Sequence, residues 1–264
     1  GASDGDVLTF SSGTGNITLQ AAGGGGATDL NGLSDCLVDT DSVYIAEVPA
    51  GLSGNPQGNL VVGVDAGDAL TSGANNTLLG NDAGKNLTTT ASNVIIGKNS
   101  GLAKTSGGNT VIIGTAAGRD TASGDYFVLI GSEAGISNTG SNAIAIGFES
   151  GRVNTATSTV SIGYHSGYSQ TSGASNTNVG YRAGYQNTTN ANRTYMGYEA
   201  GNYNSGANNT GVGYRACNGY FSFGSGQGTG ADNTAIGSYA LEANTTASYC
   251  TALGKEALKA NTIS

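Results

Sequence analysis

The sequence predicts an all-β protein built as a narrow parallel β-solenoid, and three observations lead to that prediction. A glycine returns every 16 or 17 residues along most of the chain, which is the internal period expected of stacked coils. The residues just before these glycines are mainly aliphatic and β-branched, as in short strands. The 264 residues include 46 glycines and no Trp, so large side chains are too scarce to fill a wide core.

The decapeptide NTVIIGTAAG (109–118) illustrates the repeat, with Gly114 as its repeating glycine. All steps between copies are 16 or 17 residues except one of 24, which contains an insertion at 217–232. Stacked coils lie about 4.8 Å apart, so twelve coils predict a rod about 55–60 Å long. The twelve repeating glycines are Gly63, Gly80, Gly97, Gly114, Gly131, Gly147, Gly163, Gly180, Gly197, Gly213, Gly237 and Gly254.

The aligned copies predict a role for each position. The residue before the glycine is always aliphatic or Met, and the residue two places earlier is Val, Ile, Leu or Thr. Because side chains alternate along a strand, we expect both columns to share one face, and we expect that face to be the core. The third residue after the glycine is always Ala or Ser, which predicts that another backbone segment passes close by. Asn often lies four or five residues before the glycine, as at Asn93 and Asn109, and we expect these amides to stack along the rod.

Three parts are expected along the chain. Residues 1–22 form an N-terminal β segment, because DVLTFSSGTGNITLQ (6–20) is typical of two short strands joined by a glycine turn. Residues 23–58 form a hinge and capping region, in which VYIAEVPA is a degenerate coil that covers one end of the solenoid. Residues 59–264 form the repeat domain, and we expect more repeats or another element beyond Ser264.

The middle position of each strand predicts a subunit interface. If the flanking columns face the core, this column points outward, and it is aliphatic in the first five copies. An outward aliphatic stripe should be covered by another chain, unless the strand bulges and buries both faces. The candidate interface residues are Val61, Leu78, Ile95, Ile112 and Leu129.

Aromatic residues provide a second candidate surface. Phe148 or Tyr follows the repeating glycine in five consecutive coils, and the insertion adds three more aromatic residues. One interpretation is a surface that binds a ligand such as a glycan, and the other is ring stacking that stabilises the rod. The candidate ligand residues are Tyr164, Tyr181, Tyr198, Tyr214, Tyr220, Phe221 and Phe223.

Several copies carry a family likeness. The segments NAIAIGFESG (142–151), NTAIGSYALEAN (233–244) and TALGKEALKAN (251–261) resemble the head repeats of trimeric autotransporter adhesins, the YadA-like head, which also occur in bacteriophage tail fibres. The resemblance covers about residues 59–264. It implies a left-handed β-roll, a homotrimer around a common axis, and an adhesive or fibre-shaft role. The coil of 16–17 residues is somewhat longer than the usual coil of that family.

The chain has few of the residues that other functional classes require. His165 is the only histidine, and neither a P-loop nor a metal-ligand spacing occurs, so we expect no enzyme activity, no cofactor and no metal. The formal net charge of -8 argues against nucleic acid as a partner. No run approaches the ~18 apolar residues of a membrane helix. The three cysteines, Cys36, Cys217 and Cys250, are expected to be small buried thiols.

The first functional hypothesis is therefore a structural and adhesive fibre protein. It would be a bacteriophage tail-fibre segment in the virion, a homotrimer that contacts other fibre or virion proteins and a host-surface glycan or protein. The second hypothesis is the extracellular head of a bacterial trimeric adhesin. A third, an ice-binding solenoid or another extracellular fibril component, needs an outward Thr array, whereas the column of Thr177 and Thr194 is expected to face inward.

Overall fold

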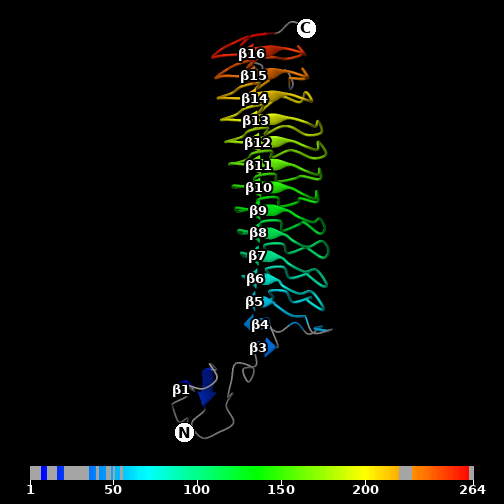
Figure 1. Cartoon of the computed structure of the whole chain (residues 1–264), viewed down its shortest axis with the longest axis vertical. Coiled ribbons are helices and arrows are strands. Elements are labelled where there is room, and N and C mark those ends of the chain that lie inside the picture. Colours follow the sequence, from blue (N-terminus) through cyan, green and yellow to red (C-terminus); the bar gives the residue numbers. More distant parts are fainter. Residues whose placement is uncertain are drawn as a thin grey trace.

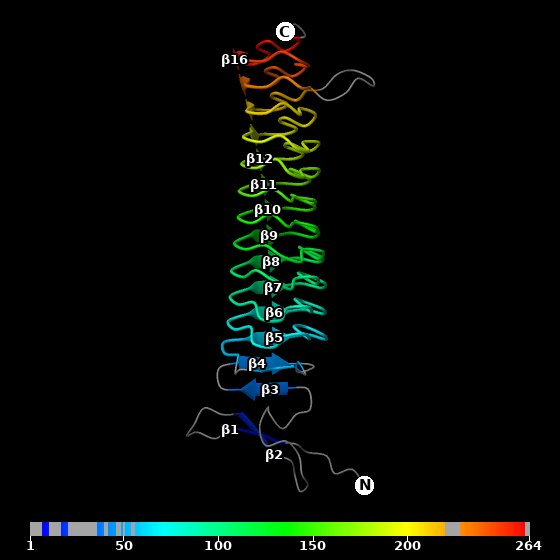
Figure 2. The same ribbon diagram turned by 90° about the vertical axis from the view of Figure 1, so that its right-hand side faces the viewer.

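The chain forms a long rod of stacked coils in the computed structural model (Figures 1 and 2). The structure describes residues 7–10, 17–20, 36–39, 42–45, 49, 51–53, 56–219 and 228–261. Each coil contributes one short strand to a single sheet, and no helix occurs in these ranges. An all-β solenoid of about twelve turns, as predicted, is confirmed.

Twelve three-residue strands follow the repeat. Each pairs in parallel with its neighbours at equivalent positions, so that the middle residues lie side by side, as Ile95 and Ile112 do. The strands are β5 (Leu60–Val62), β6 (Thr77–Leu79), β7 (Val94–Ile96), β8 (Val111–Ile113), β9 (Val128–Ile130), β10 (Ile144–Ile146), β11 (Val160–Ile162), β12 (Thr177–Val179), β13 (Thr194–Met196), β14 (Thr210–Val212), β15 (Thr234–Ile236) and β16 (Thr251–Leu253).

Four more strands lie before the repeat. Strand β4 (Ser42–Ile45), from VYIAEVPA, pairs in parallel with β5 in the register of the repeat. Strand β3 (Cys36–Asp39) pairs antiparallel with β4 and is the last strand at that end of the sheet. Strands β1 (Val7–Phe10) and β2 (Ile17–Gln20) form a separate antiparallel pair, in agreement with the two strands expected in 6–20.

The orientation that we predicted for the repeat strands is wrong. The middle residue is buried in every strand from β5 to β16, whereas the first and third residues are half-buried or exposed. Ile95 and Ile112, expected outside, are 0% exposed. Alternation determines which residues share a face, but it does not say which face is inside. We had placed the more regular columns inside, and they are outside.

The interior is thin, and one side chain per strand fills most of it. The Ala or Ser three residues after the glycine is buried there, as at Ala83 and Ser100. A Cβ added to Gly67 would lie 2.7 Å from the Leu78 side chain, which shows how little room remains. The large middle residues of β5–β9 belong to one apolar cluster that runs from Tyr44 to Ala145. A second apolar cluster runs from Ala183 to Ala252.

The repeating glycine is required by the stacking of the coils. Gly97 has a φ of +128°, and a Cβ built on it would lie 2.6 Å from the carbonyl oxygen of Gly114 in the next coil. Such a contact is far below van der Waals distance, and the backbone conformation itself disfavours a side chain. The column therefore holds glycine because adjacent coils approach each other through it.

Asn has two roles in the repeat where we expected one. Four residues before the glycine, the buried amides stack: Asn76 Nδ2 donates to Asn59 Oδ1 at 3.2 Å, and Asn93 Nδ2 donates to Asn76 Oδ1 at 2.9 Å. One position earlier, Asn75 and Asn109 are exposed and have φ values of +57° and +56°. Asn tolerates this left-handed conformation better than most residues, so it forms the turn there.

Candidate interaction surfaces

The outward face of the sheet is an uninterrupted surface without charge. It consists of the first and third residues of β5–β16, which we call the outer stripe. None of these residues is charged, and several large apolar members are exposed, among them Leu79 (43%), Met196 (43%) and Leu253 (76%). A monomeric protein in water rarely exposes so continuous a row of apolar groups. The outer stripe is therefore the first candidate for an interface.

The five residues predicted to form that interface lie inside the coil instead. Their exposed fractions are 2% or less, because their side chains fill the interior of their own coil. They support the outer stripe from behind and do not reach its surface. The corrected residues are Val61, Leu78, Ile95, Ile112 and Leu129.

The outer stripe changes chemistry along the rod. Its first column is mostly Val or Ile up to β11 and is Thr in every strand from β12 to β16. These threonines pair in register from strand to strand, so they form one straight outward row. The prediction that this column faces inward was wrong, and with it our reason for discounting an ice-binding surface. The row is Thr177, Thr194, Thr210, Thr234 and Thr251.

The aromatic ladder lies just after the repeating glycine. We define it as Phe148, Tyr164, Tyr181, Tyr198 and Tyr214, whose ring centroids are 4.8–5.5 Å apart with interplanar angles of 6–15°. The rings thus cover each other's faces, and they remain 37–43% exposed along their edges. Ring stacking, our alternative to ligand binding, is present. Ligand binding at this surface stays a prediction.

A second, shorter row accompanies the ladder. Tyr168 and Tyr185 stack at 5.0 Å, and His165 lies between the two rows, 3.9 Å from the Tyr164 ring. The Arg182 guanidinium carbon lies 5.6 Å from the Tyr181 ring centroid and 5.0 Å from that of Tyr185. The Arg182 guanidinium therefore lies between the ladder and the second row of rings.

Most charges beside the ladder are paired. Glu149 contacts Arg152 at 3.2 Å and His165 at 2.7 Å. Arg215 contacts Glu199 at 3.4 Å and Glu242 at 3.0 Å. Arg182 forms no ion pair with any carboxylate in the part of the chain that the structure describes. It is therefore the one arginine of this surface whose charge the neighbouring side chains do not neutralise.

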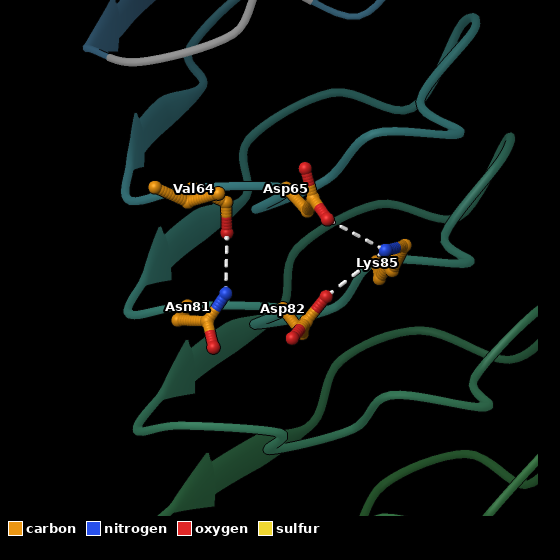
Figure 3. Close-up of polar contacts among 5 residues, drawn as sticks. All are labelled: Val64, Asp65, Asn81, Asp82 and Lys85. Carbon is orange, nitrogen blue, oxygen red and sulfur yellow. Dashed lines mark hydrogen bonds and ion pairs between the residues drawn. The ribbon is translucent and has the colours of Figure 1, made fainter.

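A charged clamp joins two coils near the other end of the rod (Figure 3). Lys85 Nζ lies 2.7 Å from Asp65 and 3.0 Å from Asp82, and Asn81 Nδ2 donates to the carbonyl of Val64 at 3.2 Å. Hydrogen bonds to Asp65 and then Asp82 raise the pKa of the Lys85 ammonium above its ordinary value. The clamp satisfies its own charges, so we regard it as structural.

Two buried cations were missed by sequence reasoning. Lys104 is fully buried, and its Nζ donates to the carbonyls of Ser106 (2.9 Å) and Gly124 (3.0 Å) beneath the Phe127 ring. Arg193 is also buried, and burial lowers the pKa of its guanidinium. Lys104 could have been noticed, because it occupies the column that holds leucine in the two preceding coils.

The insertion and the cysteines complete the predicted positions. Tyr220, Phe221 and Phe223 lie outside the described residues. Gly228, which is described, donates its N–H to the Tyr203 carbonyl at 3.0 Å. Cys217 is buried, and burial raises the pKa of its thiol to about 12. Cys250 is half-buried, and both thiols are free. With so high a pKa, the Cys217 thiol stays protonated at neutral pH and is not a reactive nucleophile.

No group of three or more His, Cys, Asp or Glu side chains that could hold a metal ion is found among the residues that the structure describes. The same residues include no helix that is long and apolar enough to cross a membrane. Comparison with protein-family models, curated proteins and solved structures finds no match for this chain. Functional inference therefore rests on the surfaces described above.

Proposed function

We propose that the protein is a segment of a structural and adhesive fibre, in which copies of the chain associate side by side along the outer stripe. The uncharged outer stripe is the observation that carries this proposal. With strands about 4.8 Å apart, its columns extend about 55 Å along the rod. The best partner for a row of such length and regularity is a surface with the same spacing, and a second copy of this chain provides one.

Three copies around one axis is the arrangement that the resemblance to YadA-like head repeats implies. Cyclic symmetry allows each chain to contribute the same stripe to a closed assembly. Such a trimer would carry about 3 × -8 = -24 formal charges, which favours solubility. A bacteriophage tail fibre is the first setting for this role, and the head of a bacterial trimeric adhesin is the second.

The test compares two outward substitutions with one inward substitution. We expect Ile113→Asp with Ile146→Asp, both on the outer stripe, to leave the β-structure intact and to lower the mass in solution from trimer to monomer. We expect Ile112→Asp, in the interior, to unfold the chain, because it buries a charge in a thin apolar core. Sedimentation equilibrium and circular dichroism measure the two effects.

A wild-type chain that sediments as a monomer would contradict side-by-side association. A double variant that keeps the wild-type mass would also contradict it, since each chain would bring two carboxylates into the interface, and these cannot be buried without loss of affinity. If the chains do associate, the gene sequence on either side of this segment distinguishes the two settings. A virion-attachment domain supports the phage fibre, and a membrane anchor supports the adhesin.

Ice binding is a second candidate function because the Thr row of β12–β16 faces outward. The same surface cannot bind ice and be covered by another chain. A monomer that produces thermal hysteresis, and loses it in Thr194→Lys with Thr210→Lys, would favour this candidate. An associating chain without thermal hysteresis would exclude it.

A further inference from the structure

We propose that Arg182 and the tyrosines around it bind an acid group of a linear polysaccharide that lies along the rod. This inference rests on the adhesive part of the proposed function and names the chemistry of its ligand. It uses the aromatic ladder and the second row of rings, and no residue of the outer stripe.

Arg182 differs from Arg152 and Arg215 on this surface because its guanidinium is not paired with a carboxylate and can bind an acid group from outside the chain. Arg152 and Arg215 are held by carboxylates, whereas Arg182 has no ion pair in the described part of the chain. Its Nε atom is shielded and has no acceptor, and neither of its terminal nitrogens is among the buried unpaired atoms. Because neither terminal nitrogen donates a hydrogen bond within the described part of the chain, both must be at least partly accessible to solvent. An acceptor from outside the chain can reach them.

The position of the guanidinium is prepared for a bidentate acid. The guanidinium carbon lies 5.6 Å from the Tyr181 ring centroid and 5.0 Å from that of Tyr185, and these two rings limit its motion before any ligand arrives. A planar guanidinium matches the two oxygens of a carboxylate or sulfate, and less side-chain entropy is lost when the fork is already held. The favoured ligand group is thus a carboxylate or a sulfate.

The ladder indicates the kind of molecule that carries this acid. Stacking covers the ring faces of Tyr164, Tyr181 and Tyr198, so a sugar cannot lie flat on them. What they offer are ring edges and phenol hydroxyls, repeated every 4.8–5.3 Å along the rod. A hydroxyl-rich linear polymer can use such a row at several points, and one acid group can bind Arg182. An acidic polysaccharide fits both features.

The overall negative charge of the chain does not prevent such a contact. The formal charge is -8, but exposed charges farther than about 8 Å are largely screened at physiological salt. Recognition must then come from the local arrangement and must depend on Arg182 itself. This gives the proposal a sharp mutational test.

The experiment titrates the full chain with polygalacturonate, which carries carboxylates, with dextran sulfate, and with neutral dextran. Tyrosine fluorescence reports binding directly, because the chain has 13 Tyr and no Trp. We expect the wild type to bind at least one acidic polymer and not neutral dextran. Arg182→Gln should weaken binding about tenfold or more, as expected for loss of a charged hydrogen bond. Arg152→Gln, whose arginine is already paired, is the matched control and should change affinity less than about twofold.

Three results would overturn the proposal: no binding by the wild type, equal binding by Arg182→Gln, or equal losses in both variants. Poly-glutamate that binds as tightly as the polysaccharides would overturn the choice of polymer. The mass in solution is measured on the same samples. A monomer that binds the polymer contradicts chain association alone, whereas a trimer that does not bind contradicts this site alone.

Discussion

Lys104 stands where the two preceding coils have Leu70 and Leu87, and it brings a positive charge into the interior. Burial lowers the pKa of its ammonium to about 8 from 10.5, although nearby Asp125 opposes the shift. The folded chain therefore releases this proton at a lower pH than the unfolded chain. Between pH 8 and 10.5 the unfolded state holds more protons, so this residue makes the free energy of unfolding rise with pH in that window.

We expect Lys104→Leu to remove this pH dependence. Between pH 7 and pH 10.5 the free energy of unfolding of the wild type should rise by about 3 kcal/mol relative to that of the variant, because only the wild type has this buried lysine. Denaturant titrations at both pH values, at one chain concentration, measure the difference. Lys98→Leu, at an exposed position, controls for the loss of a charge. A difference between Lys104→Leu and wild type that is the same at both pH values would contradict the assignment.

The repeating glycine allows a second comparison between single residues. Gly97 and Gly254 share a positive φ, +128° and +113°, but only Gly97 has a coil stacked against its Cα. Alanine at either position costs about 1–3 kcal/mol of backbone strain. We expect Gly97→Ala to cost at least about 2 kcal/mol more than Gly254→Ala, because its methyl group must also displace the next coil. Thermal unfolding measures both, and equal losses would show that stacking is not the reason for the glycine.

At the scale of the strand, the repeat predicted the existence and register of β5–β16, because period and alternation are properties of the sequence. It did not predict which face is inside. A thin coil accepts Leu78, Ala145 or Asn178 in the same interior column, so the usual link between a regular apolar column and burial fails. The buried Ala or Ser column was the signal that could have corrected us, since it indicates an interior with room for one larger side chain per coil. The free arginine at 182 could not be foreseen, because pairing depends on contacts between coils.

The aromatic ladder connects coils at the same scale. Tyr181 stacks on ladder rings on both sides, at 5.3 and 4.8 Å, whereas Phe148 ends the ladder and has one such neighbour at 5.5 Å. Each stacked pair contributes about 0.5–1.5 kcal/mol. We expect Tyr181→Ser to lower stability by about 1 kcal/mol more than Phe148→Ser, as measured by chemical denaturation. Serine is a fair replacement, since Ser132 and Ser238 occupy the same column in other coils. If the two losses are equal, the rings do not stabilise the rod by stacking on one another.

Across the whole molecule, the interior of the rod is apolar in its N-terminal part, polar in the middle, and apolar again, with some buried polar groups, in its C-terminal part. One apolar cluster ends at Ala145 and the next begins at Ala183. Between them the buried side chains include Ser161, Gln170 and Asn178. The first three rings of the aromatic ladder, Phe148, Tyr164 and Tyr181, belong to this polar stretch, where the interior provides the least apolar contact. We infer that these three rings add stabilising contacts on the surface of coils whose interior has few.

A solenoid with such a weak zone should not unfold as one unit, because each coil is stabilised mainly by its neighbours. Buried polar atoms without partners lie on the C-terminal side, including both terminal nitrogens of Arg193 and the Tyr195 hydroxyl, and each costs about 1–3 kcal/mol. We therefore expect amides of β12–β15 to lose hydrogen-exchange protection at lower denaturant than amides of β6–β9. Mass spectrometry of peptides from the two halves measures this order.

The same experiment on Ser161→Val tests the cause. Valine occupies this interior column at Val61, and its side chain would extend the N-terminal apolar cluster toward the polar zone. If the weak zone separates two unfolding units, the variant should narrow the gap between the two transitions. Loss of protection in both halves at one denaturant concentration in the wild type would mean that the backbone ladder alone couples the coils, and that the composition of the interior does not set where the rod opens.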